Sequence, residues 1–199
     1  MANFIEEFMG SLGPEVSKEL ARNLGINRKT ATQIIPQIAP LILGGLKKQK
    51  DERGGADRVD HILNKYGSAS VLDDIGGLFS AKSQEAAPDP RLGGLLGESG
   101  VEATNLISNK FKLDGNLAMK IIPMLAPVIL GALTKKRDQE GAGSGGIAGL
   151  LDQDGDGSIL DDVAGFLIGG LAGGSGSQKS GGGGGILGNL LGGLFGKRR

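Results

Sequence analysis

The chain has 199 residues, and its 22 basic and 22 acidic side chains give a formal net charge of zero. Balanced, interspersed charges exclude the basic footprint of a nucleic-acid-binding protein, and weak like-charge repulsion permits self-association into a homo-oligomer. Because the chain has no cysteine, disulfides, thiolate metal sites and thiol nucleophiles are excluded.

The first predicted element is a helix over residues 3–23. Six phenylalanines, one tyrosine and no tryptophan leave the core to Leu, Ile, Val and Ala, which favours close-packed helices over a sheet. The acidic start of the chain, residues 1–7, lacks the basic and long apolar regions of a secretory signal. We therefore expect a cytoplasmic protein, and signal-independent export is also compatible with this start.

A second helix is predicted over residues 28–50, where apolar side chains recur at helical spacing. Pro36 and Pro40 lie four residues apart on one side of this helix. Each proline removes an amide donor and strains the preceding turn, so we expect a bend. The apolar face consists of Ile34, Ile38, Leu41, Ile42 and Gly45.

Two shorter helices are predicted at 56–64 and 71–79. Ser70 and Asp73 have the spacing of a capping box, which predicts that the fourth helix opens there. The four helices together form one module, residues 1–86.

The same pattern returns in residues 87–172, so the chain contains two tandem copies of a module of roughly 85 residues. Residues 34–46 (IIPQIAPLILGGL) reappear 87 positions later as residues 121–133 (IIPMLAPVILGAL). The second copy is expected to form helices at 92–110, 115–138, 144–151 and 159–171. We predict an all-α fold, a tandem duplication of a small four-helix module with a pseudo-two-fold arrangement.

Residues 121–133 are also the most apolar run of the chain. The run is 13 residues long, whereas crossing a bilayer takes about 20. A buried core helix is therefore expected.

An aspartate-rich segment of the second copy resembles the first eight positions of an EF-hand calcium loop. Asp152, Asp154 and Asp156 occupy positions 1, 3 and 5, from which carboxylates converge on one cation. Gly157 permits the sharp turn, and the Ser158 carbonyl falls at position 7. Without a cation, three neighbouring carboxylates would repel one another. We predict one calcium site, with a solvated acidic turn as the alternative.

The loop departs from an EF-hand at position 12, where Val163 replaces the bidentate glutamate. Asp162 could be a fifth ligand or a helix cap, whereas the Ser158–Asp161 spacing predicts that Asp161 is a cap. Without a bidentate ligand, the dissociation constant should lie at the weak end, about 10⁻⁴–10⁻³ M. The first copy has other residues at the aspartate positions, namely Asn64, Tyr66 and Ser68.

A flexible Gly/Ser linker is predicted at residues 173–185, followed by an amphipathic helical tail at 186–199. Residues 191–196 of the tail (LGGLFG) nearly repeat residues 92–97 (LGGLLG), the start of the second copy. The tail therefore resembles the opening of a third module.

The Ile-Ile-Pro-x-x-Ala-Pro-x-Ile-Leu-Gly segment, the Asp-Asp pair, the aspartate loop and the Gly/Leu-rich ends together resemble the bacterial domain-of-unknown-function 937 family, which is related to YidB-like proteins. The resemblance covers about 170 residues over the two copies. It implies a bacterial, helical protein without enzymatic features, and it implies neither an activity nor functional residues.

The sequence offers no catalytic constellation. His61, the single histidine, lies beside Asp60, and the second copy has Gly149 in its place, as expected of a surface residue. No nucleophile elbow or His-Glu-x-x-His pair accompanies it. We predict that the protein is not an enzyme and has no small-molecule substrate.

The predicted function is that of a structural, self-associating helical repeat protein with a calcium-binding loop. Residues 186–199 of one copy would dock on another copy, and such a head-to-tail contact builds filaments unless it closes into a ring. One alternative is a peripheral membrane protein that contacts lipid through this apolar tail and its Lys-Arg-Arg end. Another is an adaptor that responds to calcium.

Overall fold

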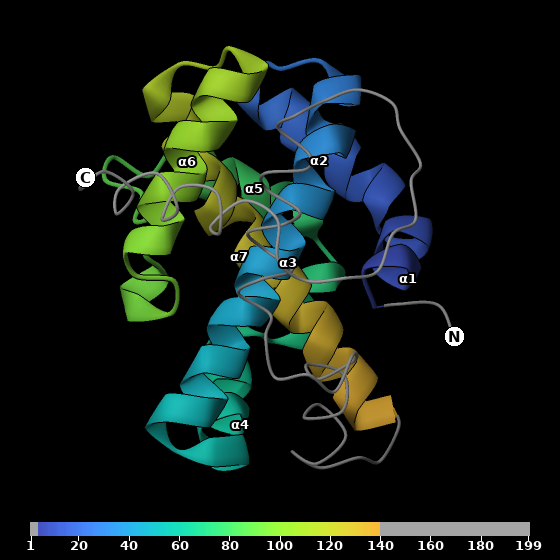
Figure 1. Ribbon diagram of the computed structural model, residues 1–199. Coiled ribbons are helices and arrows are strands. Elements are labelled where there is room, and N and C mark those ends of the chain that lie inside the picture. Colours follow the sequence, from blue (N-terminus) through green and yellow to red (C-terminus); the bar gives the residue numbers. More distant parts are fainter. Residues whose placement is uncertain (1–3, 140–199) are drawn as a thin grey trace, which may run out of the picture.

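The computed structural model describes residues 4–139, and these residues form seven α-helices and two short 3-10 helices without a strand (Figure 1). The predicted all-α class is confirmed for this part of the chain. Two long helices, α3 (Arg28–Arg53) and α7 (Gly115–Gln139), contact each other at the centre, and the shorter helices pack around them.

The predicted first helix is divided in two. Helix α1 (Phe4–Ser11) ends before Leu12, and α2 (Gly13–Leu24) begins with Pro14 in its first turn. Proline is tolerated at this position because the amide there has no partner within the helix. The short α1 is held by Phe4 and Phe8, which are buried and whose ring centroids lie 6.1 Å apart.

Helices α3 and α7 both continue through their two internal prolines. The turns before them have the same form: the Asn27 side chain accepts a hydrogen bond from the Lys29 amide at 2.7 Å, and Asp114 accepts one from the Asn116 amide at 2.8 Å. Each side chain satisfies a backbone donor that the first helical turn leaves unpaired. The predicted bounds of these two helices agree with the structure to within a few residues.

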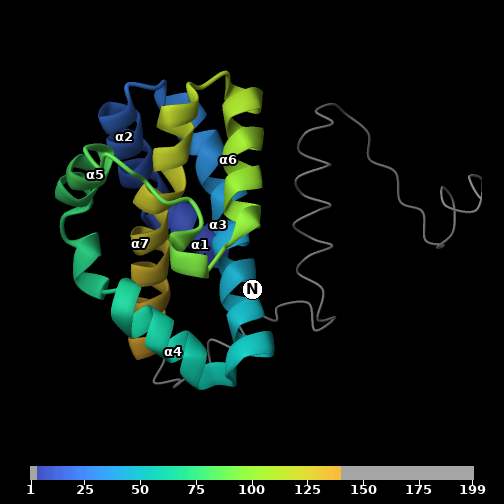
Figure 2. The same cartoon turned by 90° about the vertical axis from the view of Figure 1, so that its left-hand side faces the viewer.

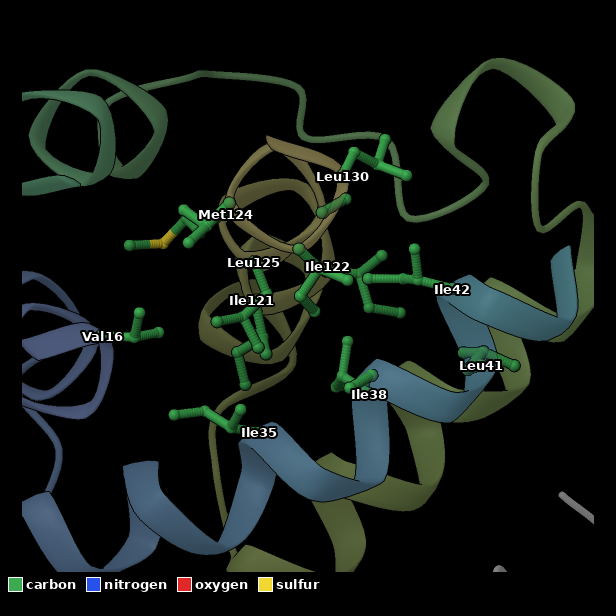
Figure 3. Packing of buried hydrophobic residues seen from close by; sticks show 14 of the residues in the cluster. Val16, Ile35, Ile38, Leu41, Ile42, Ile121, Ile122, Met124, Leu125 and Leu130 are labelled. Carbon is green, nitrogen blue, oxygen red and sulfur yellow. The ribbon is translucent and has the colours of Figure 1, made fainter. Parts of the chain in front are cut away.

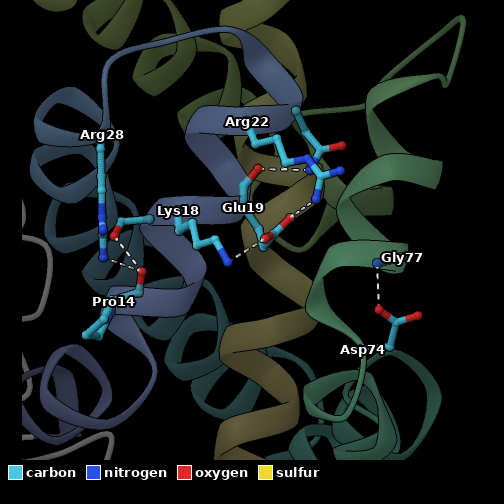
Figure 4. A network of polar contacts seen from close by, with 9 residues as sticks. Pro14, Lys18, Glu19, Arg22, Arg28, Asp74 and Gly77 are labelled. Atoms are coloured by element: carbon cyan, nitrogen blue, oxygen red, sulfur yellow. Dashed lines mark hydrogen bonds and ion pairs between the residues drawn. The ribbon is translucent and has the colours of Figure 1, made fainter.

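Helix α3 is followed by α4 (Gly55–Tyr66), the 3-10 helix η1 (Ala69–Leu72) and α5 (Ile75–Ser83). The predicted capping box at Ser70 is wrong, because Ser70 lies inside η1. Asp74 caps α5 instead, and its Oδ1 accepts a hydrogen bond from the Gly77 amide at 2.7 Å (Figure 4). A start at Ile75 also places Ile75 and Phe79 on one buried face.

The 3-10 helix η2 (Leu92–Gly94) comes next in the chain, and α6 (Glu98–Phe111) follows. Helix α6 therefore begins six residues later than the helix that was predicted at 92–110. Leu92, Gly93, Gly94 and Gly97 all have positive φ angles, which a continuous right-handed helix does not allow.

The core lies between α3 and α7. In Figure 3, Ile35, Ile38 and Ile42 of α3 lie beside Ile121 and Ile122 of α7, and all five are inaccessible to solvent. Figures 1 and 2 show α2 and α6 toward one end of this helix pair and α4 at the other.

Helix α7 is long and apolar enough to span a membrane by length and composition, but 72% of its most apolar window is buried within the protein. Its burial agrees with the expected core helix over residues 121–133.

Candidate binding groove

A groove of about 330 Å³ lies where α3, α4 and α7 meet the segment that joins the two copies. This volume is at the lower end of the range for small-ligand sites, about 300–1,000 Å³. Its lining is Gln49, Arg53, Arg58, Ile62, Tyr66, Lys82, Glu85, Ala87, Asp89, Leu92, Gly93, Gly94, Leu95, Pro123, Ala126, Pro127 and Leu130.

The floor of the groove is apolar and comes from α7. Pro123, Ala126, Pro127 and Leu130 occupy successive turns of one face. Since Pro127 has no N–H, the carbonyl of Pro123 loses its usual donor one turn later. Pro123 and Pro127, the proline pair of the second repeat, therefore both line the groove.

The polar corner of the groove is organised by Gln49, which is only 4% exposed. Its Oε1 accepts a hydrogen bond from Arg58 Nε at 3.2 Å, and its Nε2 donates to the Gly94 carbonyl at 3.4 Å. One buried amide thus joins α3, α4 and the opening of the second copy.

The acidic groups of the groove are already engaged. Glu85 forms an ion pair with Lys82 at 2.5 Å. Asp89 accepts hydrogen bonds from the amides of Arg91 and Gly93, at 2.9 and 3.0 Å, and so caps the turn that begins the second copy. Both carboxylates of the groove therefore already have partners within the protein.

Tyr66 lies at the rim and is 53% exposed, more than any other large apolar side chain in the described part of the chain. Lys65 Nζ lies 5.1 Å from the centre of its ring. A half-exposed aromatic ring beside an apolar floor is a common feature of binding surfaces, because the ring offers a large apolar area together with a polar hydroxyl.

The predicted calcium ligands Asp152, Asp154, Asp156, Ser158 and Asp162 all lie outside the described residues. Within residues 4–139, no group of three or more acidic or histidine side chains is placed to hold a metal ion.

The residues that lie 88 positions before the predicted calcium ligands have other roles in the structure. The side-chain Oδ1 of Asn64 accepts a hydrogen bond from Arg137 Nη2 at 3.1 Å, Tyr66 borders the groove, and the Ser68 hydroxyl accepts a hydrogen bond from the Ser70 amide. Asp74, the equivalent of Asp162, caps α5.

The groove has no signature in the sequence, because its walls come from residues between 49 and 130 that are far apart in the chain. The sequence around Arg53 and Arg58 did not mark them as groove residues, since charged residues near a turn between two helices usually face solvent. His61 is exposed and does not line the groove, in keeping with a surface residue.

The fold and the groove define an all-α protein whose helices enclose one core and carry an amphipathic groove on its side. The family described as "Bacterial protein of unknown function (DUF937)" matches this sequence over residues 6–137 and again over 134–197. The chain belongs to this bacterial family, and the predicted resemblance is confirmed. No curated protein and no solved structure matches the chain significantly.

Proposed function

We propose that the chain is a structural, non-enzymatic helical repeat protein of the bacterial cytoplasm that associates with other copies of itself through residues 186–199. Its two copies would form a pseudo-two-fold unit, and its tail would supply the opening segment of a third copy to a neighbouring molecule.

Equivalent turns support the duplication. Helices α2 and α6 end on left-handed residues 87 positions apart, Gly25 with φ 64° and Lys112 with φ 55°. The caps that follow, Asn27 and Asp114, have the same separation.

Reciprocal contacts support the pseudo-two-fold arrangement. Gln49 of α3 donates to the Gly94 carbonyl in the opening of the second copy. The equivalent residue of α7, Lys136, forms an ion pair at 2.5 Å with Glu7, which is equivalent to Gly94. Likewise, α2 contacts α7 and α6 contacts α3.

The observation that carries the self-association proposal is the backbone of residues 92–97. Gly93, Gly94 and Gly97 have φ angles of 59°, 93° and 57°, in the region that glycine occupies without steric cost. The tail repeats this segment 99 residues later and has glycine at all three equivalent positions: 192, 193 and 196. It lacks an equivalent of the capping Asp89, because Gly188 stands there.

The acceptor for the tail would be the face of α3 that holds residues 92–97. This segment approaches Gly45 so closely that a Cβ there would lie 2.7 Å from Leu96 Cδ2 and 2.9 Å from the Leu95 carbonyl oxygen. The equivalent position on α7 is Ala132. The tail should therefore exchange with residues 92–97 on α3 of another copy, because α7 lacks the glycine that such an approach requires.

Asp152, Asp154, Asp156 and Ser158 would hold one calcium ion, and this ion would have a structural role. The capping geometry of Asp74 favours the same helix-capping role for Asp162 over a role as a ligand. A peripheral membrane protein that uses the tail remains the alternative function, since the tail is apolar with a basic end.

The test compares two matched tail substitutions, Gly193→Val and Gly188→Val, by light scattering over a range of protein concentrations. Valine at 193 excludes the positive φ that the docked segment requires, whereas position 188 has no such requirement. We expect concentration-dependent oligomers for the natural chain and for Gly188→Val, and monomers for Gly193→Val.

A natural chain that stays monomeric at every concentration would refute self-association. Equal oligomerisation of both variants would refute docking through the glycine pattern. Sedimentation with lipid vesicles distinguishes self-association from membrane association. Both substitutions keep or increase the apolar character of the tail, so neither should weaken binding to lipid. Vesicle binding by all three proteins without oligomers would support the membrane function instead.

A further inference from the structure

We propose that the groove between α3, α4 and α7 binds a small amphiphilic carboxylate, with the acid group at Arg53 and Arg58 and the apolar part on the α7 floor. This proposal goes beyond self-association and needs no residue of the tail. The two proposals share residues 92–95, which line the groove and belong to the segment with which the tail would exchange.

The unused donors of the groove identify the acidic end of the ligand. Arg58 uses only Nε in its bond to Gln49, so its two terminal nitrogens have no hydrogen-bond partner among the described residues. The Arg53 side chain lines the groove and makes no hydrogen bond or ion pair with any residue in that part of the chain. Guanidinium groups bind carboxylates through parallel N–H donors, which makes a carboxylate the ligand group that fits this corner.

The side chains that line the groove have a net positive charge, which also favours an anionic ligand. Its cationic side chains are Arg53, Arg58 and Lys82, and its acids are Glu85 and Asp89. Lys82 and Glu85 neutralise each other, while Asp89 is occupied by two backbone amides. One guanidinium charge is left in excess, and the free donors lie on the arginine side.

The remaining surface fits an apolar chain. Ile62, Leu92 and Leu95 face the groove together with the proline-bearing face of α7. Tyr66 closes this apolar surface at the rim. The volume of about 330 Å³ restricts the ligand to a small molecule, so a medium-length aliphatic acid matches both the charge and the size.

Tyr66 makes the proposal directly measurable, because it is the only tyrosine of a chain without tryptophan. Decanoate is titrated into the full chain below its micelle-forming concentration while tyrosine emission is recorded. We expect a saturable change in emission with decanoate, and no saturable change with acetate, which lacks the chain, or with decanol, which lacks the charge.

Arg58→Gln should weaken decanoate binding about tenfold, the effect of losing one charge-assisted hydrogen bond. Arg53→Gln should weaken it in the same direction. Arg22→Gln is the matched control, since Arg22 lies on α2 outside the groove, and it should leave binding unchanged. Circular dichroism of each variant checks that the fold is retained.

Three results would overturn the proposal. The first is the absence of a saturable response to decanoate in the natural chain. The second is equal binding of decanol, which would show that the arginines play no part. The third is an equal loss of affinity in Arg22→Gln and Arg58→Gln, which would show a non-specific charge effect.

Discussion

Gly131 of α7 lies against the backbone of Ser68, at the start of η1, so closely that a Cβ at position 131 would be 2.8 Å from the Ser68 carbonyl oxygen. The preceding residues of the two segments make the reciprocal contact: a Cβ on Gly67 would lie 2.8 Å from the Leu130 carbonyl oxygen. Two glycines that are far apart in the sequence thus allow two backbone segments to touch. This contact fixes where η1 and α5 cross α7.

Gly131→Ala should destabilise the protein by about 1–3 kcal/mol, because its methyl would lie 2.8 Å from both the Ser68 carbonyl oxygen and Val71 Cγ2, so that the packed backbone or side chain must shift. Gly10→Ala is the control: no atom lies within 4 Å of its added methyl, and it should stabilise α1 by up to about 1 kcal/mol. Urea unfolding followed by circular dichroism measures both. Equal or greater stability of Gly131→Ala would contradict the close approach.

Asp74→Ala should lower stability by about 1 kcal/mol, because the amide of Gly77 loses its acceptor at the start of α5. Asp73→Ala is the matched change one residue earlier, where the side chain caps no helix in the structure, and it should have a smaller effect. Thermal unfolding of the two variants gives the comparison. A larger loss at Asp73 would restore the capping role that the sequence assigned to it.

Arg137 joins the end of α7 to α4. Its Nη1 forms an ion pair with Asp60 at 3.1 Å, and Nη2 donates to Asn64 at the same distance. Burial alone would lower the pKa of Arg137, but hydrogen bonds to Asp138 and Asp60 outweigh it and raise the pKa. The guanidinium therefore stays charged, and its stabilisation should persist through neutral and moderately alkaline pH, since it is lost only as pH rises through that raised value.

Arg137→Gln should cost about 1.5–3 kcal/mol, the usual contribution of hydrogen bonds to a charged group. A double-mutant cycle with Asp60→Asn isolates the pair, and the coupling should be clearly favourable, because the Arg137 side chain is only 14% exposed. Chemical unfolding at pH 7 and pH 9 provides the data. Additive effects of the two substitutions would show that the ion pair contributes nothing.

Asp152→Asn and Asp162→Ala should separate calcium ligation from helix capping in the second copy. If the loop binds calcium, Asp152→Asn should abolish the rise in melting temperature that calcium produces, since a bound ion stabilises the folded state. Asp162→Ala should lower stability by about 1 kcal/mol with and without calcium, as loss of a cap does. A natural chain with no calcium-dependent shift would refute the site, and loss of the shift in Asp162→Ala would make Asp162 a ligand.

Much of the helical framework followed from local pattern. The bounds of α3 and α7 were predicted because their apolar residues recur at helical spacing over more than 20 positions. The start of α5 was mispredicted, because Ser70 and Asp74 both carry side chains that cap helices. Burial of Ile75 and Phe79 decided between them, and burial is a property of the assembled core.

The sequence by itself determined the all-α class, the order of most helices and the membership of the family, because these depend on periodicity and on motifs read within a few turns. Only the tertiary structure decided that residues 82–95 lie over the prolines of α7, that Gln49 connects Arg58 to Gly94, and that Tyr66 borders the resulting groove. Such placements result from contacts between residues far apart in the chain. Their energies depend on shape and burial after folding, which no local pattern encodes.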